Sequence, residues 1–180
     1  MRVLLDTCVL IPNPIRSILL GLAERDLFFP LWSEKIFDEW EFFVSKNTNT
    51  RVEQTKIEIL LMKSKWKNSL VPRDISLENS IILPDVNDVH VLASAVTGKA
   101  QVLLTNNLKD FPSRTLARFN LIPRNVDSLL FEFFCEFPEI FEPIVQTVFE
   151  TILQQECNFY SKRSFLKRHG LHRLAKIMIS

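Results

Sequence analysis

The stretch Val-Leu-Leu-Asp-Thr-Cys-Val-Leu-Ile-Pro, from Val3 to Pro12, is almost wholly apolar, yet it carries one carboxylate, Asp6, near its middle. The continuous apolar character from Val3 to Leu5 predicts a short strand of a parallel sheet that is covered on both faces and ends at Asp6. Burying an unpaired carboxylate costs several kcal/mol. We therefore expect Asp6 to have a partner or a chemical task.

Working outward from this strand, extended and helical patterns alternate along the chain. In chain order the expected elements are a helix over 14–26 that Pro14 opens, a strand over 27–32, helices over 34–47 and 50–68, a helix that ends near Gly98, a strand over 102–105, a weak strand over 120–123, helical segments over 125–158 and a basic helical tail. Ser33 is a suitable N-cap, and Pro30 suggests an edge strand or a strand end. Strands that alternate with helices predict an α/β fold with a mainly parallel sheet.

Length and composition set broad limits on the kind of protein. The chain has 180 residues, 47% of them hydrophobic, which suits a single globular core. Lys and Arg number 22 against 21 for Asp and Glu, so the net charge of +1 favours no class of partner. Cys8, Cys135 and Cys157 have neither zinc-site nor disulfide spacing, which fits a reducing cytoplasm. The apolar runs are too short for a membrane helix, and we expect a soluble protein without a membrane partner.

Polar residues gather where the expected strands end. Asp6 follows the first strand, and Thr105, Asn106 and Asn107 follow the strand that begins at Val102. In a parallel α/β sheet, ligands bind beyond the carboxyl ends of the strands. We expect this edge to be the functional one.

Three further carboxylates can reach the same edge. Asp85 and Asp88 precede the helix that leads into the Val102 strand, and Glu39 lies about one turn inside the helix that follows the second strand. If Asp6, Glu39 and Asp88 meet, each pair about 4 Å apart repels by about 4 kcal/mol at an effective dielectric constant of about 20. A cation is needed between them, and oxygen ligands favour Mg²⁺ or Mn²⁺. Such a cluster can activate water for phosphodiester hydrolysis, which predicts a metal-dependent nuclease.

Four stretches in order, "VLLDTCVL", "SEKIFDEW", "LPDVNDVHVLASAV" and "VLLTNNLKDFP", resemble the PIN domain, in particular the branch whose members often act as toxins of bacterial toxin–antitoxin pairs. The resemblance covers roughly residues 1–135. It implies a three-layer α/β/α fold and a Mg²⁺- or Mn²⁺-dependent endoribonuclease that cleaves RNA. It also implies a homodimer and inhibition by a cognate antitoxin.

Carried over by position, the resemblance makes Asp6, Glu39 and Asp88 the acidic residues of a catalytic metal site. The fourth acidic position of many members follows a threonine by two residues, and here Asn107 stands there. An asparagine can coordinate through its carbonyl oxygen but adds no charge, so a second ion would be held more weakly unless Asp110 supplies the ligand. Asp85 is a further candidate ligand, ranked below Asp88.

The resemblance also sets the expected organisation of the chain. We expect a PIN-like nuclease domain over 1–135 and a C-terminal helical extension over 136–180 that packs on the same domain. Residues 125–161 contain no Lys or Arg but several acids, whereas 161–176 contain no acid. This segregation suggests that RNA phosphates and a protein partner use different surfaces.

Simpler structural roles remain open for the same residues. Asp6 could cap the following turn, Asp85 and Asp88 could be turn and N-cap residues, and Glu39 could be an ordinary solvated helix residue. We expect the histidines, His90 among them, to be structural.

Other functions remain open as well. A phosphatase of the haloacid-dehalogenase type wants a second acid two residues after Asp6, where this chain has Cys8. A nucleotide-binding fold is disfavoured further, because the isolated glycines make no phosphate-cradling loop. The remaining alternative is a non-catalytic PIN-like binding or regulatory protein with a degenerate metal site, which Asn107 supports.

Overall fold

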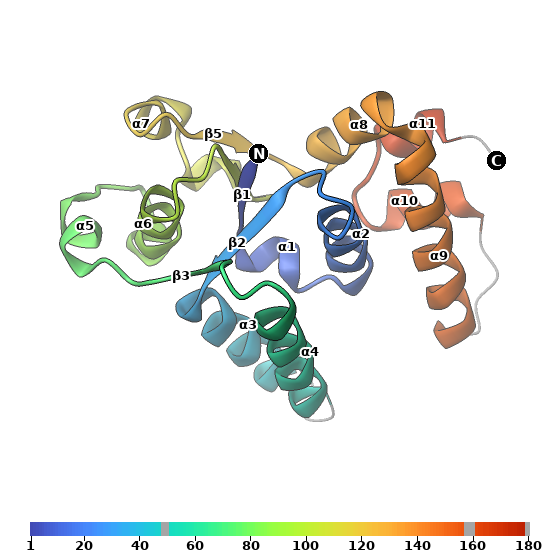
Figure 1. Cartoon of the computed structure of the whole chain (residues 1–180), viewed down its shortest axis with the longest axis horizontal. Coiled ribbons are helices and arrows are strands. Elements are labelled where there is room, and N and C mark those ends of the chain that lie inside the picture. The colour runs from blue at the N-terminus through green and yellow to red at the C-terminus, as the bar shows by residue number, and fades with distance from the viewer. Residues whose placement is uncertain (48–50, 157–160, 179–180) are drawn as a thin grey trace.

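The computed structural model describes residues 1–47, 51–156 and 161–178. Its centre is a five-stranded sheet in which every strand pair is parallel (Figure 1). The strands are β1 (Arg2–Leu5), β2 (Phe29–Ser33), β3 (Leu70–Val71), β4 (Val102–Leu104) and β5 (Ile122–Arg124), in the spatial order β3-β2-β1-β4-β5. The expected parallel α/β sheet is confirmed.

Helices cover both faces of this sheet and make the three layers expected from the sequence. They are α1 (Thr7–Leu10), α2 (Asn13–Ala23), α3 (Glu34–Asn47), α4 (Val52–Lys65), α5 (Ile75–Ser80), α6 (Val89–Thr97), α7 (Ser113–Ala117), α8 (Val126–Glu136), α9 (Pro138–Glu156), α10 (Lys162–Arg168) and α11 (Leu174–Ile177). Figure 1 shows α6 on one side of the sheet and α1 and α2 on the other. Short 3₁₀ turns, η1 (Val86–Asp88) and η2 (Leu108–Asp110), lie in the connections. None of the described helices is long and apolar enough to cross a membrane.

The register of β1 explains the apolar run with which the chain begins. Leu4 lies opposite Leu31 of β2 and Leu103 of β4, and all three side chains are fully buried. A strand with a neighbour on each side and helices over both faces has no contact with solvent, so its side chains must be apolar throughout. Asp6 is the first residue beyond this buried strand.

Some expected elements are corrected by the structure. The sheet has five strands where four were expected, because β3 is only two residues long and carries no readable pattern; α5 and α7 were likewise not expected. Of the two interpretations of Pro30, the strand end fits, because Pro30 is the second residue of β2, and the edge strand does not, because β2 lies between β3 and β1. Because β3 pairs only with Trp32 and Ser33, Pro30 has a strand neighbour on one side alone, and its missing N–H is tolerated there.

The expected cap at Ser33 is confirmed, and the structure shows how two later helices begin. The Ile36 N–H lies 3.4 Å from Ser33 Oγ at the start of α3, and Asn125 accepts from the Ser128 N–H at 2.8 Å at the start of α8. Pro138 begins α9, and Pro143 lies inside it. The expected helical end near Asn158, together with Cys157 and Thr50, lies outside the described residues.

Gly98 ends α6 as expected, but for a packing reason. Its φ is −75°, and the left-handed residue after the helix is Lys99 with φ 51°. A Cβ on Gly98 would lie 2.8 Å from a Val71 methyl and 3.0 Å from a Leu31 methyl. The glycine therefore lets the end of α6 approach β2 and β3 closely.

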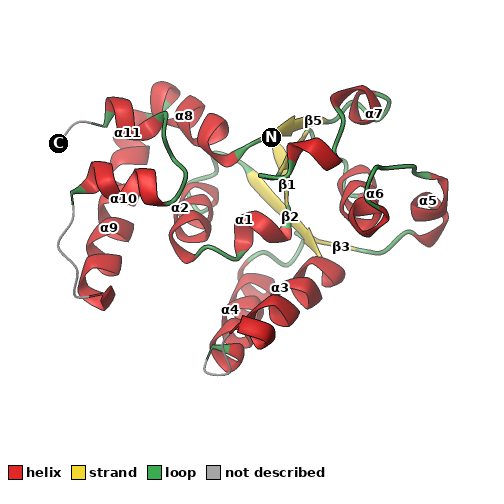
Figure 2. Cartoon of the chain, turned by 180° about the vertical axis from the view of Figure 1, so that it is seen from behind, coloured by secondary structure: helices red, strands yellow, loops and turns green. Residues whose placement is uncertain are grey.

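Helix α9 packs against α2, on the side away from the sheet, and α8 and α10 pack against α9 (Figure 2). A Cβ on Gly21 would lie 2.8 Å from Ile144, so this glycine admits α9 to close contact with α2. The expected basic helical tail is two short helices, which bury Phe165, Leu166, Leu171 and Leu174 and leave Ile177 41% exposed. Helix α8 crosses the expected boundary between residues 135 and 136, and the division into a nuclease domain and an extension stays a prediction.

A buried cation joins the helices on one flank of the sheet. The Arg16 side chain of α2 pairs with Glu58 of α4, donates to the Leu10 and Ile11 carbonyls, and lies 4.5 Å over the Trp40 ring of α3. Burial lowers the Arg16 pKa, and the charge and hydrogen bond of Glu58 oppose that shift. The buried Arg16 charge, which needs Glu58 as its counterion, thus connects the α3–α4 hairpin to α2.

Replacing Glu58 by Ala should destabilise the protein, because it leaves the Arg16 charge buried without a counterion. The expected loss is about 2 kcal/mol, at the low end for a broken buried pair because Glu58 is partly exposed. The matched control is Glu53→Ala on the same helix, whose pair with Lys56 is exposed and should cost less than about 0.5 kcal/mol. Urea unfolding measures both, and equal losses in the two variants would contradict the role given to Arg16.

Candidate active site

Every acidic residue expected at the site comes from a segment that leaves the carboxyl edge of the sheet. Asp6 directly follows β1, and Thr105 to Asn107 directly follow β4. Glu39 lies in α3, which follows β2, and Asp85 and Asp88 lie in the connection into α6. Because β1, β2 and β4 are adjacent and parallel, these segments begin at one edge.

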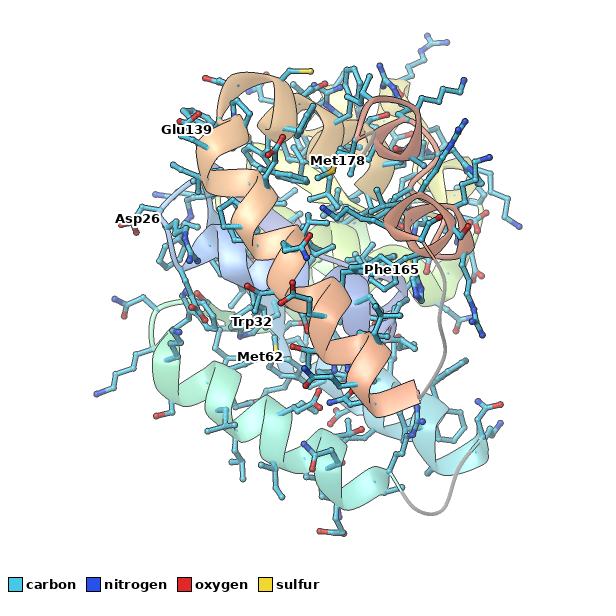
Figure 3. The ribbon with its side chains drawn as sticks, turned by 90° about the vertical axis from the view of Figure 1, so that its right-hand side faces the viewer. Asp26, Trp32, Met62, Glu139, Phe165 and Met178 are labelled. Atoms are coloured by element: carbon cyan, nitrogen blue, oxygen red, sulfur yellow. The ribbon has the colours of Figure 1, made fainter. Side chains whose placement is uncertain are left out.

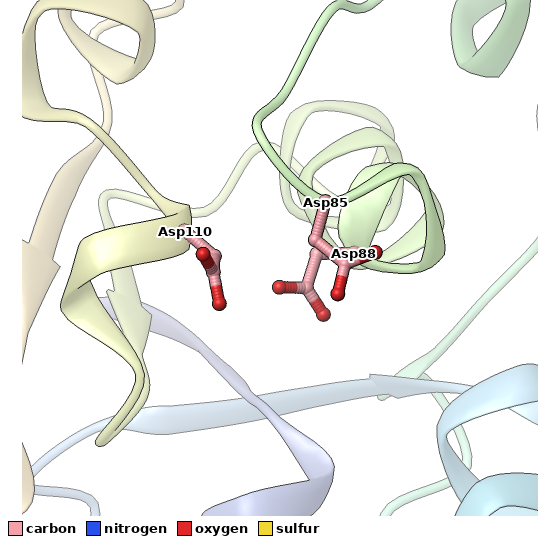
Figure 4. Close-up of side chains that lie close together, drawn as sticks. All are labelled: Asp85, Asp88 and Asp110. Carbon is pink, nitrogen blue, oxygen red and sulfur yellow. The ribbon is translucent and has the colours of Figure 1, made fainter.

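Asp85, Asp88 and Asp110 form the closest group of carboxylates (Figure 4). One oxygen from each lies within 4.8 Å of the others, and all three side chains are half-buried. Asp85 also accepts from the Asn87 N–H at 2.9 Å, so it caps the turn before α6. The cap role considered for Asp88 is not seen, because its side chain makes no capping hydrogen bond.

Asn107 lies between two of these carboxylates. Its Nδ2 donates to Asp110 at 2.6 Å and lies 3.4 Å from Asp88 Oδ2. The Asn107 N–H in turn donates to Thr105 Oγ1 at 3.0 Å, which fixes the turn. The amide therefore supplies a neutral donor at the position where the resemblance places an acid, and Asp110 accepts its hydrogen bond.

Asp6 is 7% exposed, and its burial is compensated by donors from neighbouring residues. Thr105 Oγ1 donates to Asp6 Oδ2 at 2.6 Å, and Cys8 Sγ lies 3.1 Å from the same oxygen. Burial and the Asp6 charge raise the pKa of the Cys8 thiol to about 12, so the thiol keeps its proton. Both Thr105 and Cys8 contact Oδ2 of Asp6. Oδ1 accepts no hydrogen bond from the described part of the chain.

Glu39 is held at both of its oxygens. Thr7 Oγ1 donates to Oε2 at 2.7 Å, and His90 Nε2 lies 2.7 Å from Oε1. Since a carboxylate only accepts, Nε2 carries the proton, and the buried Nδ1 has no partner among the described residues. Burial alone would raise the Glu39 pKa, but the hydrogen bonds from His90 and Thr7 and the His90 charge outweigh it, so the pKa is lowered.

The negative charges of the neighbouring acids act on Asp88. Its pKa is raised to about 6, first by burial and then by the charges of Asp6, Asp85, Asp110 and Glu39. Lys109 Nζ lies 4.0 Å from Asp110 Oδ2, at the outer limit of an ion pair. The site is therefore an accumulation of negative charge that is only partly balanced.

The structure thus brings together some expected ligands more closely than others. Asp85, Asp88 and Asp110 are in mutual reach and Asn107 contacts the last two, whereas Asp6 and Glu39 act on this group through their charge without belonging to it. His90 was expected to be structural, and its contact with Glu39 joins two helices that sequence spacing cannot relate. The all-oxygen donor set fits a hard divalent cation such as Mg²⁺ or Mn²⁺.

A cavity of about 660 Å³ opens beside Glu39. Its wall includes buried hydroxyl groups of Ser33 and Ser94, the His90 ring and the side chain of Phe42, which is 60% exposed. Lys35 and Arg73 contribute cationic groups to the same wall, Glu34, Asp38, Glu39 and Glu78 contribute carboxylates, and Arg73 is paired with Glu78 at 2.8 Å. The acidic site is therefore bordered by a concave surface with apolar, polar and charged groups.

Comparison with known proteins identifies the family. The family model described as PIN domain matches residues 2–109. No curated protein matches the chain. Among solved structures, a chain of VapBC2 from Rickettsia felis, bound to a DNA fragment from its promoter, is similar with a TM-score of 0.48 and 23% identity, covering 69% of this chain and 98% of that chain.

Replacing Asp88 by Asn should stabilise the metal-free protein above pH 6. An acid with a raised pKa binds more protons folded than unfolded between its ordinary pKa of 3.8 and about 6, so ionisation costs stability as the pH rises through that window. The expected gain at pH 7.5 is about 1 kcal/mol after solvent screening is allowed for, and it should vanish near pH 4. Thermal melts in EDTA across this range test it, with the exposed Asp38→Asn as control; a gain that does not change with pH contradicts the charge accumulation.

Replacing Asn107 by Asp should act in the opposite sense without metal. The change removes the donor to Asp110 and adds a like charge, so the melting temperature in EDTA should fall, whereas Mn²⁺ should raise it by more than in the wild type. Asn107→Ala is the control, since it removes the donor without adding charge. An equal response of both variants to Mn²⁺ would show that position 107 does not face the cation.

Proposed function

The chain belongs to the PIN-domain family, and from this premise we propose that it is a Mg²⁺- or Mn²⁺-dependent endoribonuclease and the toxin of a toxin–antitoxin pair. The observation that carries the proposal is the group formed by Asp85, Asp88 and Asp110, with Asp6 and Glu39 beside it. Carboxylates this close together repel one another, and a divalent cation bound between them offsets that repulsion.

The metal would be held by Asp88, Asp110 and Asp85, with Asp6 and Glu39 completing the site and Asn107 bordering it. When bound, the cation polarises a phosphoryl oxygen and lowers the pKa of a bound water. The remaining steps belong to the side chains of the chain itself.

Hydrogen bonds fix the orientation of Asp6 and Glu39 in the site. Thr105 and Cys8 occupy Oδ2 of Asp6, which leaves Oδ1 for a ligand. His90 and Thr7 hold Glu39 from both sides and favour its charged form. Charged groups fixed before the substrate arrives need no reorganisation during the reaction.

The cavity beside Glu39 offers room for a nucleotide that flanks the scissile phosphodiester. The exposed Phe42 ring can stack on a base, and Lys35 can contact a phosphate. Single-stranded RNA, whose bases are free to leave a stack, is the substrate form that suits such a wall.

The inhibitory partner implied by the resemblance would find an apolar surface on the α3–α4 hairpin. Its exposed apolar side chains are Phe42 and Phe43 of α3 and Ile57, Leu60 and Leu61 of α4. Large exposed apolar patches mark protein interaction sites. We assign the antitoxin, or the second subunit of a homodimer, to this hairpin.

Incubation of purified chain with total RNA in Mg²⁺, Mn²⁺ or EDTA tests the activity. Cleavage should need the cation, and Asp6→Asn and Asp88→Asn should each lower its rate at least about 100-fold, while the exposed Glu53→Gln should leave it unchanged. Circular dichroism checks that the variants fold. RNA that stays intact with every metal, although Mn²⁺ still raises the melting temperature, would favour the non-catalytic PIN-like alternative.

A further inference from the structure

We propose that helices α10 and α11 form a docking surface for the phosphate backbone of the RNA substrate. We call it the tail surface and define it by Lys162, Arg163, Lys167, Arg173 and Lys176. It lies outside residues 2–109, which the family model matches. The inference rests on the proposed function, because it names how that substrate is held.

The packing of the tail decides which of its side chains face solvent. Phe165 and Leu166 of α10 and Leu174 of α11 are fully buried, and Phe165 contacts Phe149 of α9 edge-on with ring centroids 5.4 Å apart. Figure 3 shows Phe165 and Met178 on the side of the tail helices that faces α9. With the apolar side docked, Arg163, Lys167 and Lys176 are left exposed.

The exposed charge of the tail surface has a single sign. Residues 161–180 contain no Asp or Glu, and none of the ion pairs found within the described ranges includes Lys162, Arg163, Lys167 or Lys176. Arg163 and Lys167 are four residues apart on one helix face, where like charges destabilise a helix. An anionic ligand with regularly spaced charges would compensate this repulsion.

Hydrogen bonds connect the tail surface to the candidate active site. The Arg173 N–H donates to Asp127 Oδ2 at 2.9 Å, and the Arg173 guanidinium donates to Ser128 Oγ at 3.2 Å, both at the start of α8. The neighbouring Val126 N–H donates to Asn106 Oδ1 at 3.4 Å, and Asn106 follows Thr105, the donor to Asp6.

The active site therefore has two flanks. The cavity with Phe42 lies toward β3, and the start of α11 is anchored beside the loop after β4, toward β5. An RNA strand that enters the cavity can cross the carboxylates and continue onto the tail surface.

The composition of the tail surface favours a nucleic acid over a protein. Protein interfaces have an apolar centre and are depleted in Lys, whereas phosphate backbones are bound by Lys and Arg. Ile177 is the large apolar side chain exposed in the described part of the tail; the other exposed groups are basic or polar. This combination suits a ligand that offers charge and no apolar patch.

The test compares binding of a fluorescent single-stranded RNA oligonucleotide by the full chain in EDTA, so that cleavage does not interfere. The tail variant is Arg163→Gln, Lys167→Gln and Lys176→Gln together. The matched control is Lys56→Gln, Lys63→Gln and Lys65→Gln on α4, which removes the same charge from lysines that are ion-paired. Melting temperatures verify that both fold.

The tail variant should raise the Kd on the order of 10-fold at about 0.1 M salt and lower the slope of log Kd against log salt by about 2, since each phosphate that the protein no longer neutralises lowers it by about 0.7. The control should change neither by more than half as much. Equal binding by the tail variant, the control and the wild type would overturn the proposal. So would displacement by poly-glutamate as efficient as by RNA, because the surface would then fit an acidic protein segment.

The cleavage assay separates this outcome from that of the proposed function. RNA that binds through the tail surface but stays intact with Mg²⁺ and Mn²⁺ would refute the nuclease and leave the docking surface standing. Metal-dependent cleavage that the tail variant performs with unchanged KM would refute the docking surface and leave the nuclease standing.

Discussion

The parallel pairing of β1 with β2 on one side and β4 on the other is the constraint on which the rest of the molecule depends. Parallel neighbours deliver their carboxyl ends to the same edge, so the segments after the three strands must start there. This alone brings Asp6, the α3 helix and the Thr105 to Asp110 loop into one neighbourhood. The connection into α6 then adds Asp85 and Asp88.

The same convergence creates repulsion between the carboxylates, and hydrogen-bond donors stabilise two of them. Asp6 is matched by Thr105 and Cys8, and Glu39 by His90 and Thr7. Asp88 has no comparable set of donors among the described residues, and the neighbouring charges therefore act on it most strongly. The distribution of donors thus separates the acids whose charge is stabilised by hydrogen bonds from those that still need a counterion.

The α3–α4 hairpin and helix α9, which lie outside the sheet, are held by particular close contacts with α2. Arg16 ties the α3–α4 hairpin to α2, and Gly21 allows α9 to pack on the same helix. Helix α2 is therefore the shared support of two appendages. We assign a protein partner to the hairpin and the RNA backbone to the tail surface. Because Phe42 of the hairpin also lines the cavity assigned to a nucleotide, a bound partner would cover that end of the RNA path and leave the tail surface open.

The sequence by itself determined the order of the main strands and helices, the parallel sheet and the acidic character of its carboxyl edge. These features depend on local properties: an apolar run with Asp6 at its end, a cap at Ser33, and the spacing of acids along the chain. It also pointed to the family, through four stretches in order between residues 3 and 112, and the family model matches residues 2–109. The two-residue strand β3 could not be read, because a segment that short has no periodicity of its own.

Only the tertiary structure decided which acids meet and what holds each of them. The contacts of Glu39 with His90 and of Arg16 with Glu58 join residues 51 and 42 positions apart, on helices whose relative placement no local pattern specifies. The placement of Asp110 beside Asp85 and Asp88, with Asn107 as the donor between Asp88 and Asp110, depends on how the η2 turn folds after β4. Packing across the sheet edge, and not the residue types alone, turned a list of acids into a site.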